Sequence, residues 1–194
     1  RTDYSLRRLV HYTGTDWRHV QPWVLLTNYH RYVDQFVRLA LAEIEAGTAL
    51  ALITPGGILI DRTGIDVSAA ERVMAAPWHR FQMPAYHLLR ENGEGVTLVN
   101  IGVGPSNAKN ITDHVAVLRP HAWLMLGHCA GLRNSQTLGD YVLAHAYLRQ
   151  DHVLDADLPR EVPVPALAEI QTAIEKAVGR VTGLKGYELK RVMR

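Results

Sequence analysis

The fold is decided by the stretch Val96-Thr97-Leu98-Val99-Asn100-Ile101-Gly102-Val103-Gly104-Pro105-Ser106-Asn107. Its first half is mainly apolar and rich in β-branched side chains, which predicts a strand buried on both faces. The two glycines then permit a tight turn, and we expect Ser106 or Asn107 to cap the amides of a following helix. A strand, a glycine turn and a helix in this order predict one unit of an α/β fold.

Similar patterns flank this stretch on both sides. Apolar residues recur at three- and four-residue spacing from Asn28 to Ala46, which predicts an amphipathic helix with Gly47 as its C-cap. We expect further buried strands at residues 49–53, 122–126 and 139–146, a continuation of the sheet at 57–60 and a surface helix over 67–76. The chain is therefore predicted to form a parallel or mixed sheet covered by helices on both sides.

The two ends of the chain give weaker signals. Residues 1–22 are predicted to be a lead-in that packs on the main body, because Tyr12, Trp17 and Trp23 are spaced too irregularly for a helix face. Near the other end, apolar spacing over residues 167–178 predicts a helix with Pro165 in its first turn.

The composition indicates an ordinary folded domain. The chain has 194 residues, of which 47% are apolar and 21% charged, enough for one core. A net charge of only +2 argues against nucleic-acid binding, and the basic residues near the end are expected to form a solvated helix face: Arg180, Lys185, Lys190, Arg191 and Arg194. Cys129 is the only cysteine, which favours a reducing compartment such as the cytoplasm, and no apolar run reaches the roughly 20 residues of a membrane span.

Glycine-rich loops follow three of the predicted strands, and in an α/β sheet such loops form the ligand crevice. We therefore expect the turns to converge on one site. The helix that begins near Asn28 could also hold a phosphate at its start, although a plain N-cap is the simpler interpretation. The candidate residues are Gly56, Gly57, Gly102, Val103, Gly104, Ser106, Asn107, Gly127, His128 and Gly131 for the ligand, and Asn28, Tyr29 and Arg31 for a phosphate.

Other chemistries are disfavoured. Asn107 stands where a dinucleotide fingerprint needs its third glycine, and the chain has no phosphate-binding Gly-Lys-Ser/Thr pattern, so we expect no cofactor. The pairs His79/His87 and His145/His152 lack metal-ligand spacing, so we expect no metal. Cys129 is expected to be a small buried packing residue rather than a nucleophile.

Several of these segments together resemble AMP nucleosidases. The resemblance is carried by Thr27-Asn28-Tyr29 and by residues 99–109, 116–120, 123–133, 139–149 and 151–155. It implies a three-layer α/β/α sandwich similar to the nucleoside phosphorylases and a bacterial cytoplasmic hexamer that takes part in purine salvage. It also implies AMP as substrate, which is hydrolysed to adenine and ribose 5-phosphate, with ATP as activator and phosphate as inhibitor.

The resemblance further implies how the site is arranged. Gly102 to Ser106 are expected beside the ribose, and Gly127 to Gly131 beside the base and the phosphate or water. Phosphorylases place an arginine and a serine for inorganic phosphate where this chain has Met125 and His128, which favours water as the attacking group.

The resemblance also leaves parts of the enzyme to be accounted for. The acid that protonates the purine, an Asp, and the Met-Glu pair that holds the ribose hydroxyls are expected beyond Arg194. Residues 1–23 are expected to be a connector from a regulatory domain, and residues 24–194 the N-terminal portion of the catalytic domain. The alternatives are a purine nucleoside phosphorylase-like enzyme and a non-catalytic nucleotide-binding fragment.

Overall fold

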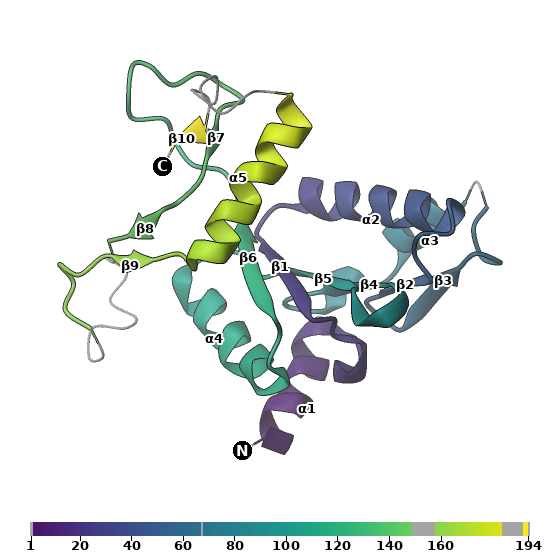
Figure 1. Ribbon diagram of the computed structural model, residues 1–194. Coiled ribbons are helices and arrows are strands. Elements are labelled where there is room, and N and C mark those ends of the chain that lie inside the picture. The colour runs from purple at the N-terminus through teal and green to yellow at the C-terminus, as the bar shows by residue number, and fades with distance from the viewer. Residues whose placement is uncertain (1, 67, 149–157, 184–191, 194) are drawn as a thin grey trace. The chain divides into compact units, whose positions relative to one another are not determined.

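The computed structural model describes residues 2–66, 68–148, 158–183 and 192–193. The chain divides into two compact units, Arg1–Gly127 and His128–Arg194. The first unit contains a six-stranded sheet in the order β3-β2-β4-β5-β1-β6, and the second contains short strands and one long helix, α5 (Figure 1). Residues 151–155, which carry part of the resemblance, lie outside the described residues, as do Lys185, Lys190, Arg191 and Arg194.

The sheet of the first unit is mixed, as predicted. β1 lies between β5 and β6 and is parallel to both, whereas β4 is antiparallel to β5 and β2, and β3 is antiparallel to β2. The predicted strands in the regions of 49–53, 57–60, 96–101 and 122–126 are confirmed, while β1 and β4 were not predicted. The strands are β1 (Trp23–Thr27), β2 (Ala51–Thr54), β3 (Ile58–Asp61), β4 (Ala85–Leu89), β5 (Val96–Asn100) and β6 (Ala122–Leu126).

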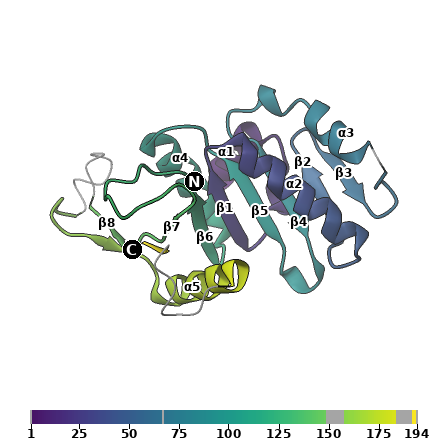
Figure 2. The ribbon, with the colours of Figure 1, turned by 90° about the horizontal axis from the view of Figure 1, so that it is seen from above.

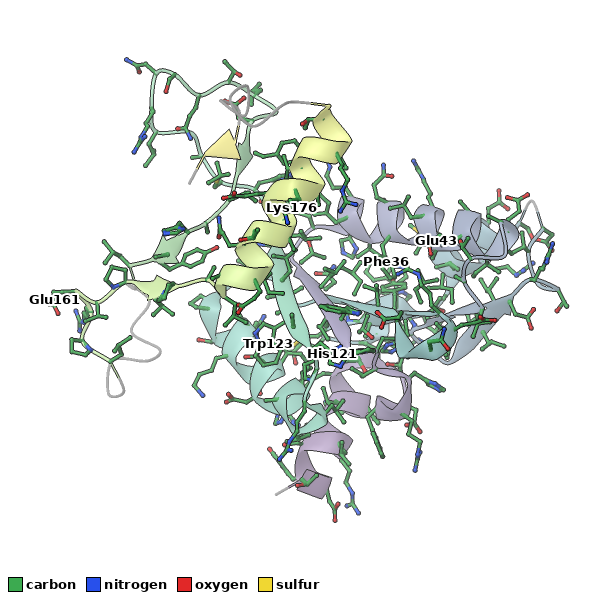
Figure 3. The ribbon with its side chains drawn as sticks, in the orientation of Figure 1. Phe36, Glu43, His121, Trp123, Glu161 and Lys176 are labelled. Atoms are coloured by element: carbon green, nitrogen blue, oxygen red, sulfur yellow. The ribbon has the colours of Figure 1, made fainter. Side chains whose placement is uncertain are left out.

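Helices cover both faces of this sheet, which confirms the three-layer arrangement (Figures 1 and 2). One face packs on α2 (His30–Glu45) and α3 (Ala69–Ala75), and Phe36 lies in this core between α2 and the sheet (Figure 3). The other face packs on α1 (Thr2–Thr13) and α4 (Pro105–Val115) through a second core cluster. Short 3₁₀ helices complete the unit: η1 (Trp17–His19), η2 (Trp78–Arg80), η3 (Glu91–Gly93) and η4 (Ala116–Leu118).

The expectation that the first 22 residues contain no helix is wrong. α1 is an amphipathic helix whose buried face carries Leu9 and Tyr12, at three-residue spacing, together with Thr13. Trp17 and Trp23, which obscured this pattern, belong to η1 and β1 instead. The segment does pack on the main body, because Leu9 and Tyr12 are almost fully buried among residues of β1, β5 and α4.

The predicted helix over residues 28–46 is confirmed as α2, with Gly47 at a left-handed φ of 76° directly after the C-cap Ala46. Its last turn is tied to the sheet by a bidentate ion pair. Arg90, which follows β4, donates from Nη2 and Nε to the two carboxylate oxygens of Glu43 at 2.7 and 2.8 Å. This geometry fixes the end of α2 over the end of β4.

The second unit corrects two predictions. Residues 139–146 form no continuous buried strand but two exposed two-residue strands, β7 (Tyr141–Val142), paired with β10 (Val192–Met193), and β8 (Ala146–Tyr147), paired with β9 (Val164–Pro165). Pro165 therefore belongs to a strand. The helix α5 (Ala168–Thr182) begins after Leu167, which is its N-cap. In both cases an apolar sequence run was too short to determine its own pairing partner.

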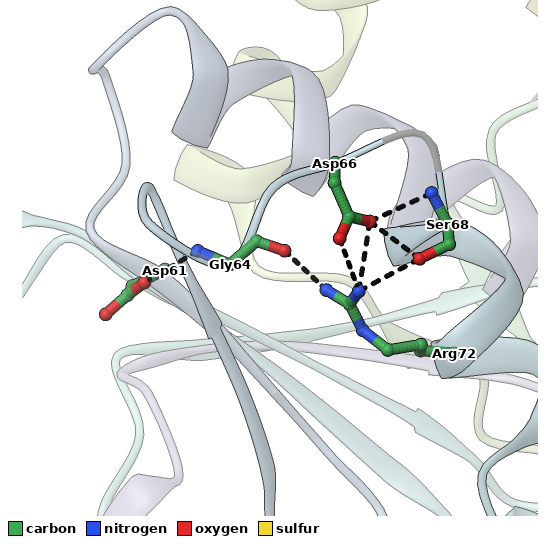
Figure 4. Close-up of polar contacts among 5 residues, drawn as sticks. All are labelled: Asp61, Gly64, Asp66, Ser68 and Arg72. Carbon is green, nitrogen blue, oxygen red and sulfur yellow. Dashed lines mark hydrogen bonds and ion pairs between the residues drawn. The ribbon is translucent and has the colours of Figure 1, made fainter.

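The connection from β3 to α3 is organised by Arg72 (Figure 4). The Nη1 atom of Arg72 donates to both carboxylate oxygens of Asp66, at 2.8 and 2.9 Å, and to Ser68 Oγ, while Nη2 donates to the carbonyl of Gly64. The hydrogen bond from Arg72 is the largest cause that lowers the pKa of Asp66. These polar contacts hold the connection together with Ile65, which packs partly buried against the core cluster.

His87 on β4 joins three segments in the interior of the first unit. It is fully buried, its Nδ1 lies 2.9 Å from Thr97 Oγ1 on β5, and its Nε2 lies 2.7 Å from Thr15 Oγ1 in the α1–β1 connection. Burial, and secondarily the charge of nearby His19, lowers the pKa of His87 to about 3. The imidazole is therefore neutral in the folded protein at neutral pH.

This buried histidine predicts a pH-dependent stability. In the unfolded chain His87 binds a proton when the pH falls below the ordinary histidine pKa of about 6.5, whereas in the folded chain it stays neutral down to about pH 3. The free energy of unfolding therefore falls as the pH drops from about 6.5 towards 3, by at most about 1.4 kcal/mol per pH unit. We expect His87→Gln to flatten the fall in unfolding free energy, measured by urea titration at successive pH values, relative to the parent. The exposed substitution His79→Gln is the control. Equal slopes in all three proteins would contradict the buried, neutral state of His87.

A second prediction concerns Gly14, which ends α1. Its φ is +70°, and a β-carbon there would collide with the ring of Phe81, whereas Gly93, at φ +72°, has open space around it. Alanine at either position costs the left-handed strain of about 1–2 kcal/mol, and at Gly14 the collision adds roughly 1–3 kcal/mol. Chemical denaturation should therefore show Gly14→Ala to be the more destabilised variant. Equal losses would show that Phe81 moves aside freely.

Candidate functional site

Four strands of the first unit end at the same edge of the sheet. β1 is parallel to β5 and β6, and β2 runs in the same direction because both β2 and β5 are antiparallel to β4. The turns that begin at Pro55, Ile101 and Gly127 therefore leave this one edge, together with the start of α2. The carboxyl edge of an α/β sheet is where such proteins bind ligands, so we take it as the candidate site.

The turn at Gly56 and Gly57 is the outlying part of this edge. β4 separates β2 from β5, which sets the turn roughly 10 Å from the end of β5. Both glycines have left-handed φ values and both amides are already used, since Gly56 N donates to Gly14 O at 2.9 Å and Gly57 N to Thr54 O at 3.0 Å. The turn lines an open groove of about 440 Å³ with Val10, Gly14, Thr15, Asp16, His19, Ile53 and Leu59.

The turn after β5 presents free backbone donors. Gly104, at φ 105° and ψ 151°, is the N-cap of α4 and supplies no capping side chain, so the expected cap by Ser106 or Asn107 is wrong. Asn107 instead donates its side-chain amide to Val103 O at 3.2 Å. The backbone amides of Ser106 and Asn107 make no hydrogen bond within the described residues. They are available to an anion at the positive end of the helix.

The start of α2 provides a second set of donors next to the first. Tyr29 is the N-cap and makes no side-chain capping bond, and the amides of His30 and Arg31 have no hydrogen-bond partner within the described ranges. The side chain of Arg31 is exposed, and the His30 ring lies 4.5 Å from that of Trp78. α2 and α4 cover opposite faces of the sheet but begin after neighbouring strands, so both positive helix ends lie at the β1–β5 junction (Figure 1).

Two asparagines stand between these helix ends, one at the end of each strand. Asn100 is 5% exposed, and its Oδ1 accepts the amide of Gly102 at 3.2 Å, which holds the glycine turn in place. The Oδ1 of Asn28 is buried and has no hydrogen-bond partner among the described residues, and a β-carbon built on Gly127 would lie 3.7 Å from it. Asn28 was a candidate from the sequence, whereas Asn100 was missed, although an asparagine that ends an apolar strand is a usable signal.

The remaining candidates, His128 and Gly131, belong to the second unit, where Arg133 N donates to Gln136 Oε1 beside Gly131. Their neighbour Cys129 is exposed, so the expectation that it is a buried packing residue is wrong. Within the described ranges no three histidine, cysteine or carboxylate side chains gather as metal ligands. In the same ranges, no helix is both long enough and apolar enough to cross a bilayer.

Comparisons with known proteins identify the relatives of this chain. No protein-family model matches it. The AMP nucleosidases of Escherichia coli K12 and O157:H7 are each 55% identical to it over its whole length. The chain is homologous to AMP nucleosidases. It spans 40% of the length of these two relatives.

The fold agrees with this homology. The crystal structure of AMP nucleosidase from Bacteroides thetaiotaomicron superimposes with a TM-score of 0.67 and 26% identity, covering 95% of this chain and 64% of that one. A purine nucleoside phosphorylase from Toxoplasma gondii, at 13% identity and TM-score 0.59, and a uridine phosphorylase from Vibrio fischeri, at 11% and 0.61, share the fold. Each of these two superpositions covers 90% of this chain and 59% of the phosphorylase chain.

Proposed function

We propose that this chain forms part of an AMP nucleosidase, which hydrolyses the N-glycosidic bond of AMP to give adenine and ribose 5-phosphate. The observation that carries the proposal is the 55% identity to two AMP nucleosidases along the entire chain. The matched region includes both strand ends and both helix starts of the candidate site. The two sets of free helix amides suit a substrate with a phosphate group.

We assign the candidate residues to parts of the nucleotide as follows. The turn after β5 and the first turn of α4 would contact the ribose and its phosphate through Gly102, Val103, Gly104, Ser106 and Asn107. The start of α2 would contribute Tyr29 and Arg31 to the 5′-phosphate, and Asn28, which the sequence also made a phosphate candidate, would lie beside it. Gly127, His128 and Gly131 would lie near the base or the attacking water. Gly56 and Gly57 would only shape the rim of the nucleotide site, because the backbone amides of these two glycines already donate hydrogen bonds within the protein.

The chemistry of this reaction requires departure of the purine from an oxocarbenium-like ribosyl centre. Free amides at the two helix starts would hold the phosphate and so fix the sugar for attack by water. Neither the acid that protonates the purine nor the carboxylate that holds the ribose hydroxyls is assigned to any residue of this chain. Residues 1–23 would be the connector from a regulatory domain, and residues 24–194 part of the catalytic domain.

The family resemblance supports further assignments. These are a hexameric assembly, a place in the bacterial cytoplasm, a role in purine salvage, activation by ATP and inhibition by phosphate. Because the chain spans 40% of its curated relatives, we attach neither effector to a residue of the chain.

Chromatographic detection of adenine tests the proposal directly. We expect the full-length enzyme that contains this chain, incubated with AMP, to yield adenine and ribose 5-phosphate at a rate that added inorganic phosphate does not raise. Release that depends on phosphate would replace hydrolysis by phosphorolysis. Binding of AMP without release would leave the non-catalytic nucleotide-binding alternative, and absence of both binding and release would contradict the proposal.

The role of the turn after β5 can be tested through Gly104. At φ 105° and ψ 151° this position suits only glycine, so Gly104→Ala must distort the turn that presents the amides of Ser106 and Asn107. We expect calorimetric titration to show about tenfold weaker binding of ribose 5-phosphate, the loss of about one charge-assisted hydrogen bond. Gly93→Ala, at a surface turn away from this edge, is the control. Unchanged affinity in Gly104→Ala would remove this turn from the phosphate site.

A further inference from the structure

Asn28 carries a polar atom that the protein leaves without a partner. Its Oδ1 is buried, accepts no hydrogen bond from the described residues, and faces Gly127 at the end of the neighbouring strand β6. A buried acceptor that lacks a donor costs roughly 1–3 kcal/mol, so proteins retain one where a ligand or a bound water supplies the donor. The atom lies at the carboxyl edge of the sheet, where a ligand is expected for independent reasons.

The chemistry of this oxygen limits what it can bind. An amide oxygen only accepts hydrogen bonds, and so do the oxygens of an ionised phosphate, so this atom cannot be a phosphate ligand. Any partner of Oδ1 must be a donor, such as a hydroxyl group, an amine or a water molecule.

The position of Asn28 selects among these donors. The residue lies two positions before His30, the first residue of α2, whose free amides suit a phosphate. In a ribosyl phosphate the sugar is bonded directly to the phosphate, so its hydroxyl groups come nearest to Asn28, whereas the amine of adenine is at the far end of the nucleotide. We propose that Asn28 Oδ1 accepts a hydrogen bond from a ribose hydroxyl of the bound nucleotide. This inference rests on the proposed function.

Paired titrations with ribose 5-phosphate and inorganic phosphate test the assignment. Asn28→Leu keeps the approximate size of the side chain and removes the acceptor. We expect its affinity for ribose 5-phosphate to fall about tenfold while its affinity for inorganic phosphate stays at the parent value. Its melting temperature should stay equal or rise, because an unsatisfied buried oxygen has been removed. Asn28→Ala, which also lacks the acceptor, should show the same split between the two ligands.

The matched control is Asn110→Leu. Asn110 is a partly buried asparagine on α4 that donates from Nδ2 to the hydroxyl of Tyr12 at 2.9 Å, so its loss should lower the melting temperature and leave binding of ribose 5-phosphate unchanged. If Asn28→Leu likewise lowers the melting temperature and leaves binding of ribose 5-phosphate unchanged, the role of Asn28 is structural and the inference is overturned.

The other outcomes are equally decisive. Equal affinities for ribose 5-phosphate in parent and Asn28→Leu would show that the oxygen holds only a water. If Asn28→Leu binds ribose 5-phosphate and inorganic phosphate more weakly by the same factor, Asn28 contacts the phosphate. Each of these two results overturns the inference and leaves the proposed function standing. If the parent protein binds no ribose 5-phosphate, the proposed function fails along with the inference.

Discussion

The parallel hydrogen bonding of β1 between β5 and β6 is the constraint on which the site depends. It pairs Thr27 with Asn100 on one side and with Leu126 on the other, so three strands end at one level. The residues that follow them are consequently neighbours, although Asn28 lies 73 positions before Ile101 and 99 positions before Gly127 along the chain. Helices begin soon after two of these ends, on opposite faces of the sheet, and both direct free amides towards the same edge.

The interior of the first unit is held by polar as well as apolar contacts. Apolar clusters on each face attach α2 and α3 to one side and α1 and α4 to the other. The hydrogen bonds of His87 to Thr15 and Thr97 then fix the α1–β1 connection beneath β4 and β5. This buried network also fixes the path of the chain between α1 and η1, because each of its hydrogen-bonding groups needs its partner.

The contrast between Asn100 and Asn28 explains how the carboxyl edge of the sheet can combine rigidity with ligand binding. The side chain of Asn100 is committed to the glycine turn, whose shape it maintains. The Oδ1 atom of Asn28 is buried and accepts no hydrogen bond from the residues that the structure describes. The hydrolysis proposed for this chain needs a sugar that is held firmly while its base departs, and it would use both features, a fixed cradle and groups in it that can bind.

The sequence by itself determined the class of the fold, the helix α2, the buried strands of the first unit with their glycine turns and the likeness to AMP nucleosidases, because these depend on local periodicity and on motifs that are continuous along the chain. It did not reveal α1, whose pattern was obscured by the aromatic residues that follow. It also did not reveal β4, which carries His87 among apolar residues and is buried at all but its last position. The predictions for residues 139–146 and for Pro165 were wrong because strand pairing depends on residues that are distant along the chain. Only the tertiary structure decided that Asn100 is engaged and Asn28 Oδ1 is not, since the number of hydrogen bonds at a buried atom depends on neighbours that are distant in sequence.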